Sequence, residues 1–254
     1  MVNQYTPSIQ RKEGEPTRIN VAENITFAHP FAGPNDYRGI AQEILKNKVK
    51  KMYLPDGEKT SYLVRAVYCG PQKFQSQPES IELREQIMKP RYLWLFQRNL
   101  WIPKEVKTNY GPGVFVVYDE KGVGTSEELD IGELERELKG GRKLKNGIIF
   151  SEDEKTSFAP RNTYREGEMS SKEFANDGFI IISNKEQGAR NLAEVSQSNH
   201  FEYKKPRSWI VDPGNKPVQT VSALGYGDWD VVRLNFYGYY HVDFRVGHAS
   251  GVLD

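Results

Sequence analysis

The end of the sequence holds residues whose types and spacing could do chemistry. In "YYHVDFRV" (239–246) polar and apolar residues alternate. Since side chains alternate between the two faces of a strand, we expect Tyr239, His241, Asp243 and Arg245 on one face. The imidazole could act as a general base oriented by the carboxylate two residues away, and the guanidinium could bind an anion. The sequence therefore offers His241, Asp243 and Arg245 as candidate catalytic residues.

The same alternation is equally typical of an antiparallel strand with one solvent-exposed face. Same-face neighbours on one strand lie about 7 Å apart, too far for a direct hydrogen bond without a bend. Tyr240, Val242, Phe244 and Val246 would then point into the core. A face of tyrosines and charges can also dock a partner. We therefore predict that the four residues Tyr239, His241, Asp243 and Arg245 form a ligand-binding face.

A second candidate site comes from carboxylates that follow apolar runs. Asp119 and Glu120 follow "GVFVVY", and Glu152 and Asp153 follow "GIIFS". If these runs and "GFIIIS" (178–183) were parallel neighbouring strands, their ends would converge on one edge of the sheet, where α/β folds bind ligands. Gathered carboxylates suit a divalent cation such as Mg²⁺ and metal-assisted hydrolysis. The alternative is that these acidic residues only form turns.

Glycines in "DEKGVGTSEELD" (119–130) resemble a phosphate-binding loop that opens a helix. The P-loop pattern requires a lysine directly before the Ser/Thr and a longer glycine spacing, and both are absent. A flexible loop between two elements would explain the same residues. Phosphate handling is therefore kept only as a variant of the hydrolase hypothesis.

A third candidate surface combines basic and aromatic residues in "KKPRSW" (204–209). Lys204, Lys205 and Arg207 could hold phosphates while Trp209 stacks on a base. The whole chain is nearly neutral, however, with 35 basic and 34 acidic residues and a formal net charge of +1. A nucleic-acid partner is therefore expected less than a protein partner or a homo-oligomer.

Other patterns carry little chemistry. "GHASG" (247–251) places its serine one residue too late for a nucleophile elbow. The single Cys69 excludes an intrachain disulfide, and we expect a partly buried apolar role for it. The four histidines show no zinc-ligand spacing.

Composition bounds the class of protein. The chain has 254 residues, enough for a sizeable core, and its apolar runs are far shorter than a membrane span. Residues 1–18 lack the apolar stretch of a signal peptide and are expected to be a solvated or disordered tail. We therefore expect a cytoplasmic protein with one compact domain over 19–254 and a subdomain boundary at 70–80.

The elements that would position these residues are read from periodicity. Apolar residues at helical spacing predict a helix from Asn35 or Asp36 onward. Pro55, Asp56 and Gly57 predict a turn, so 52–68 is read as a hairpin. The aromatic run that starts at Arg91 is assigned to a helix that ends before Pro103.

Towards the C-terminus the pattern is clearer. Strands are predicted at 113–118, 147–150 and 178–183, and helices at 130–139, 170–177 and 185–196. The run "DVVRLNFYGYYHVDFRV" (230–246) predicts an antiparallel hairpin that turns near Gly238.

Together these elements predict an α+β fold with a mixed, mainly antiparallel sheet and several short helices. The leading hypothesis for function is a non-enzymatic binding or accessory protein that uses the face of the last hairpin. The alternatives are a metal-dependent hydrolase or phosphate-handling enzyme, and a nucleic-acid-associated protein.

Overall fold

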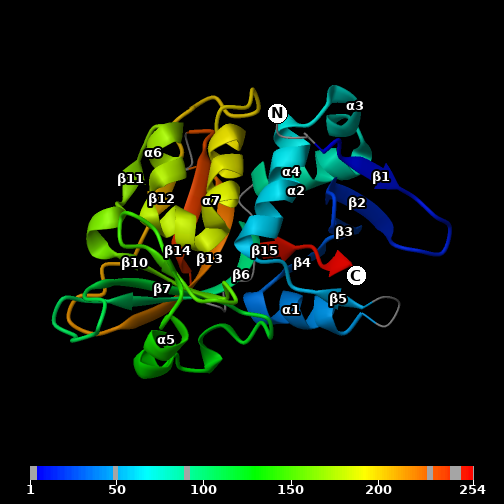
Figure 1. The fold of residues 1–254 in the computed structure, drawn as a ribbon. Helices are drawn as coiled ribbons and strands as arrows, with labels where there is room; N and C mark the ends of the chain where they lie inside the picture. Colours follow the sequence, from blue (N-terminus) through cyan, green and yellow to red (C-terminus); the bar gives the residue numbers. More distant parts are fainter. Residues whose placement is uncertain (1–4, 48–50, 89–91, 228–230, 241–246, 254) are drawn as a thin grey trace.

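The computed structural model describes residues 5–47, 51–88, 92–227, 231–240 and 247–253. Within these residues the chain forms two β-sheets and seven α-helices (Figure 1). The helices are α1 (Tyr37–Leu45), α2 (Gly57–Cys69), α3 (Gln72–Gln75), α4 (Pro78–Met88), α5 (Ile131–Glu137), α6 (Ser171–Asn176) and α7 (Gly178–Val195). Two short 3₁₀ helices span Gly124–Ser126 and Arg161–Thr163.

The larger sheet forms the centre of the molecule. Its main path runs β11 (Gly167–Glu168), β12 (Arg207–Trp209), β14 (Leu234–Tyr240), β13 (Val218–Tyr226), β6 (Tyr92–Ile102), β7 (Gly113–Tyr118), β10 (Thr156–Pro160), β9 (Ile149–Phe150) and β8 (Arg142–Lys143). β15 (Gly247–Ala249) pairs with β6 and with β4 (Ala32–Asn35). Only the pairs β12–β14 and β15–β6 are parallel among the described strands. The predicted α+β class with a mainly antiparallel sheet is therefore confirmed.

The smaller sheet joins the two ends of the described chain. Its order is β1 (Ser8–Gln10), β2 (Thr17–Ala22), β3 (Ile25–His29), β16 (Val252–Leu253) and β5 (Met52–Tyr53). Strand β1 lies within the segment predicted to be a tail. Its Ser8 and Gln10 are exposed, yet β1 pairs with β2, so this part of the predicted tail is ordered by backbone hydrogen bonds.

The predicted hairpin over 52–68 is wrong, because the residues after Asp56 form helix α2. The Asp56 carboxylate accepts a hydrogen bond from the backbone N–H of Lys59 at 2.8 Å, which is the N-cap arrangement. Leu63, Val64 and Val67 are buried and recur at helical spacing. The Pro-Asp-Gly letters therefore mark a helix start rather than a hairpin turn.

Two further segments have the opposite secondary structure to the one predicted. The aromatic run predicted as a helix is the central strand β6, which is buried on both faces. Residues 178–183, predicted as a strand, form the first part of α7, whose N-cap Asp177 accepts from the N–H groups of Phe179 and Ile180 at 3.0 and 3.2 Å. Both runs are almost wholly buried, and a run that is buried on all sides gives no period that separates a strand from a helix.

The helices α2 and α7 pack together on one face of the larger sheet, and α6 lies beside α7 (Figure 1). Helix α7 is kinked at Lys185, whose backbone angles (φ 54°, ψ 174°) are not helical. At this kink Gly57, the first residue of α2, lies against the backbone of Ser183. A Cβ atom on Gly57 would lie 2.1 Å from the Ser183 carbonyl oxygen, so the close packing of the two helices requires glycine.

We predict that Gly57→Ala destabilises the protein by about 2 kcal/mol or more, because overpacking forces backbone shifts. Urea unfolding measures the change. Gly132→Ala in the exposed helix α5 is the matched control, since its new methyl group would meet only the Asp130 carboxylate at 3.2 Å. Equal stability of the two variants would contradict the observed packing of α2 on α7.

Candidate functional site

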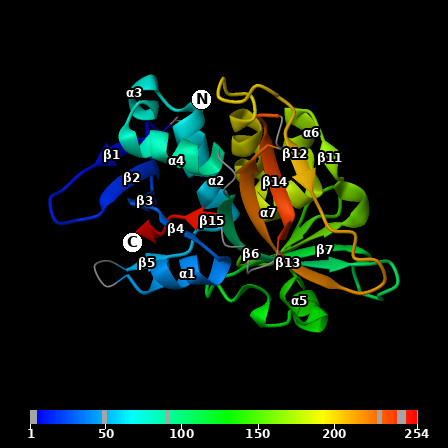
Figure 2. The ribbon, with the colours of Figure 1, turned by 180° about the vertical axis from the view of Figure 1, so that it is seen from behind.

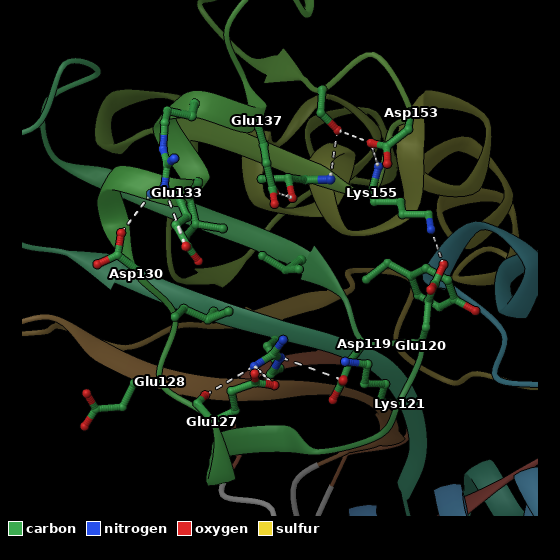
Figure 3. A pocket seen from close by; sticks show the side chains of 18 of the residues that line it. Asp119, Glu120, Lys121, Glu127, Glu128, Asp130, Glu133, Glu137, Asp153 and Lys155 are labelled. Carbon is green, nitrogen blue, oxygen red and sulfur yellow. Dashed lines mark hydrogen bonds and ion pairs between the residues drawn. The ribbon is translucent and has the colours of Figure 1, made fainter.

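The four carboxylates predicted to bind a metal line one cavity. β7 and β9 both run antiparallel to β10, which lies between them, so β7 and β9 end at the same edge of the sheet. Asp119, Glu120, Glu152 and Asp153 all line a cavity of about 680 Å³ at this edge (Figure 3). The predicted convergence thus occurs for two of the three segments, and the third segment belongs to α7.

Asp119 is only 2% exposed and is held by protein donors. It accepts hydrogen bonds from the backbone N–H groups of Gly124 at 2.8 Å and Val123 at 3.3 Å, and from the Tyr37 hydroxyl at 3.1 Å. Arg98 Nε lies 3.8 Å away. Burial, together with the Asp119 charge, raises the pKa of Tyr37. The Asp119 carboxylate therefore occupies the backbone donors of the glycine-rich loop that a phosphate would need.

The other three carboxylates lie at the exposed rim of the cavity. Glu120 is paired with Lys155, and the Ser151 hydroxyl donates to Asp153 at 2.7 Å (Figure 3). This hydrogen bond lowers the pKa of the Asp153 carboxyl. Across the described ranges, no three His, Cys, Asp or Glu side chains gather into a group that could hold a metal ion. The geometry gives the metal-dependent hydrolase hypothesis no support.

The aromatic side chains of β12 and β14 form a second feature, which we call the aromatic patch. The Arg207 guanidinium lies over the Trp209 ring, 3.6 Å from its centroid. The Trp209 and Tyr237 rings are stacked with their centroids 6.4 Å apart, and Tyr239 contacts both rings. Arg207, Trp209 and Tyr239 are half-buried. Tyr92 and Tyr240 complete the patch.

The patch lies on the face of β12 and β14 that points away from α7. Helix α7 packs on the opposite face, where Phe179 contacts Phe236 at 5.4 Å. On the patch side, α1 packs against β6, where Tyr37 contacts Trp94 and Phe96. None of the described helices lies over the outer face of β12 and β14 (Figure 2). Within the patch Tyr237 and Tyr240 are buried, whereas Trp209, Tyr239 and Tyr92 are half-buried and present exposed edges.

A β-bulge at Gly238 sets the orientation of the tyrosines. Val221 of β13 pairs with Tyr240, whereas Ala223 pairs with Tyr237, so β14 contains one extra residue between these pairs. The bulge changes the alternation of side chains, and both Tyr239 and Tyr240 contact Tyr237. The expectation that Tyr239 and Tyr240 lie on opposite faces is therefore wrong.

Buried hydrogen bonds hold the bulge in place. The Gly238 carbonyl accepts from the Thr220 hydroxyl at 2.6 Å and from the Asn99 side-chain amide at 3.3 Å. Thr220 in turn accepts from the Trp101 indole N–H at 2.9 Å, and Asn99 donates to Ser222 at 2.9 Å. We call these residues the bulge network. A Cβ atom on Gly238 would lie 2.4 Å from the Phe179 ring, so this position also requires glycine.

The predicted hairpin also turns at a different place. β13 and β14 do form an antiparallel pair, but β14 continues past the bulge at Gly238 instead of turning there. The two strands are joined by residues 227–233, ahead of the predicted turn. His241, Asp243 and Arg245, the candidate catalytic residues, lie outside the described residues. Of the predicted ligand-binding face, Tyr239 alone lies within the described part and belongs to the aromatic patch.

The predicted basic surface is divided by the structure. Lys204 Nζ donates to the carbonyl oxygens of Ser198 and Phe201 and so fixes its own loop. Arg207 and Trp209 belong to the aromatic patch, and Lys205 is exposed. The four residues therefore do not act together as one basic surface, and a nucleic-acid partner gains no support.

Cys69 is half-buried at the end of α2, as expected. Burial raises the pKa of its thiol to about 11, so the thiol is protonated at neutral pH and a poor nucleophile.

Sequence reasoning missed Tyr237 and Tyr92 as members of the patch. Three tyrosines in "FYGYY" (236–240) were a usable signal, since strict alternation could not place all three on one face without a bulge. The glycine between them is a common sign of such a bulge.

Comparison with known proteins addresses the fold. No family model matches the sequence, and no curated protein is significantly similar to it. The chain is similar to a solved structure described as "Accommodation of massive sequence variation in Nanoarchaeota by the C-type lectin fold". The TM-score is 0.52 at 14% sequence identity, and the match covers 86% of this chain and 94% of that chain.

The fold is C-type lectin-like. At this level of identity the likeness concerns the path of the backbone and says nothing about ligands. Within the C-type lectin-like fold of this chain, the aromatic patch lies on the larger sheet and the acidic cavity lies at its β7–β9 edge. Among the described residues, no helix combines the length and apolar character needed to cross a bilayer.

We predict that Thr220→Val lowers the free energy of unfolding by about 1–3 kcal/mol, because it leaves the Trp101 indole N–H and the Gly238 carbonyl short of a buried partner. Denaturant unfolding measures the loss. Thr125→Val, at a half-exposed position, is the control. A variant as stable as the wild type would show that the bulge network does not hold β14.

Proposed function

We propose that the chain is a non-enzymatic binding protein that recognises a protein partner through the aromatic patch. The observation that carries this proposal is the Arg207–Trp209 stack beside Tyr237 and Tyr239, on a sheet face that no described helix covers. Tyr, Trp and Arg are the residues most enriched at the energetic centres of protein interfaces. Half-buried aromatic rings lose little conformational entropy on binding, because their neighbours already hold them.

The fold itself favours a binding role. The similar structure is described as accommodating massive sequence variation on the C-type lectin fold. A backbone that tolerates variation suits a protein whose surface side chains change while its sheet stays the same. In this chain the bulge network is buried beneath the patch, so substitutions of Trp209 or Tyr239 leave the supporting contacts intact.

Catalysis has less support in the described residues. The carboxylates of the acidic cavity are held by protein donors or exposed, and the Cys69 thiol is protonated. His241, Asp243 and Arg245 stay a prediction, and so does the cytoplasmic location.

A peptide-display selection tests the proposal. Binders are selected on the wild-type chain, and their affinities are then measured for the variants Trp209→Ala and Tyr239→Ala. We expect losses of about 2 kcal/mol for most binders, because truncating a central aromatic residue of an interface costs about that much. Tyr5→Ala, at a position 42% exposed on another part of the surface, is the matched control and should cost little.

Binders that keep full affinity for both patch variants would contradict the proposal. Circular dichroism of each variant checks that the fold is retained. This check separates the loss of a contact from the loss of structure.

A further inference from the structure

A second cavity, of about 480 Å³, lies beside the kink of α7, and we call it the kink cavity. It is lined by the N-terminal turn of α2, the ends of β7 and β10, and Ile182, Ser183 and Lys185 of α7. It lies on the α2–α7 side of the larger sheet, away from the aromatic patch. It therefore needs a separate functional explanation.

Two buried polar side chains in the wall of the kink cavity lack partners. Gln97 is 2% exposed and Ser183 is 5% exposed. The Gln97 side-chain nitrogen and the Ser183 hydroxyl have no hydrogen-bond partner among the described residues. The two residues lie near each other, since a Cβ atom on Gly57 would lie 3.1 Å from Gln97 Oε1 and 2.1 Å from the Ser183 carbonyl oxygen. Buried donors are almost always satisfied, so these two indicate a ligand that offers acceptor oxygens.

The rim of the kink cavity is charged and strained. Lys185 has a positive φ of 54°, an unfavourable conformation for a residue other than glycine. Its Nζ lies 2.9 Å from Glu154 and 3.4 Å from Glu58. Glu154 also pairs with Arg142 at 3.2 Å. Glu58 therefore forms the longer of the two ion pairs with Lys185. Burial raises the pKa of the Glu58 carboxyl.

The chemistry of the lining narrows the class of ligand. Five carboxylates and three lysines line the kink cavity, so a phosphate or other polyanion would be repelled. A bare cation is also disfavoured, because the two unpartnered groups of the lining, Gln97 Nε2 and the Ser183 hydroxyl, can donate and no described carboxylates gather for a metal. The lining suits a small molecule with an anionic end and a cationic end.

We propose that the kink cavity binds a small zwitterion of the α-amino acid type. Its carboxylate accepts hydrogen bonds from Ser183 and Gln97, and its ammonium group pairs with Glu58. The proposal does not depend on the function of the aromatic patch, because no residue of the patch lines this cavity.

Isothermal titration calorimetry with the standard L-amino acids, each tested singly at millimolar concentration, tests this proposal on the full chain. We expect at least one to bind. Its N-acetyl derivative and its carboxamide should each bind at least about tenfold more weakly, because each lacks one of the two charges. No heat with any amino acid, or equal binding of the blocked derivatives, would overturn the proposal.

Two variants locate the binding. Ser183→Ala and Glu58→Gln should each lower the affinity for the amino acid by about tenfold, as expected for the loss of a hydrogen bond or an ion pair with a charged ligand. Ser183→Ala removes a hydroxyl without a partner, so it should leave the unliganded chain folded and its unfolding midpoint unchanged. Ser126→Ala and Glu128→Gln, both exposed and outside the kink cavity, are the matched controls. Unchanged affinity in both cavity variants would place the amino acid elsewhere and overturn the proposal.

Discussion

The buried hydrogen bonds around Gly238 are the constraint on which the binding surface depends. Asn99 and Thr220, from β6 and β13, both donate to the Gly238 carbonyl of β14. Because these donors lie inside the sheet, they fix the extra residue of the bulge at one position. Three tyrosines then gather next to Trp209. A buried polar network that is fully satisfied specifies one arrangement of the strands, and here that arrangement defines the surface.

The two faces of the larger sheet serve different purposes. One face is covered by α2 and α7, whose close contact at Gly57 allows the kink at Lys185 and the cavity beside it. On the opposite face α1 packs against β6, and no described helix lies over β12 and β14. The proposed partner surface and the proposed zwitterion site therefore lie on opposite faces of the same sheet. Each can be removed by substitution without touching the other.

The elements that could be predicted from the sequence are helices that begin with a capping residue and whose apolar residues recur at helical spacing. Helices α1 and α5 follow from the capping residues Asp36 and Asp130, and both were predicted at the right place. The segments 92–102 and 178–183 were exchanged between helix and strand, because side chains buried on all sides leave no amphipathic pattern. Only tertiary packing decides such segments.

The candidate site was predictable in composition but not in geometry. Tyr239 and Trp209 were both selected from the sequence, yet they were assigned to different surfaces. Their meeting depends on the parallel pairing of β12 with β14, which joins residues about thirty positions apart, and on the bulge at Gly238. Similarly, the sequence placed Asp119 beside a glycine-rich loop without showing that the loop donates its hydrogen bonds to that carboxylate.

Hydroxyl-radical footprinting of the chain with and without a selected binder tests the central claim most directly, because it reports the solvent access of individual aromatic side chains. The account predicts that oxidation of Trp209 and Tyr239 falls in the complex while that of Tyr5 is unchanged. A complex in which Trp209 and Tyr239 are oxidised as fast as in the free chain would contradict it.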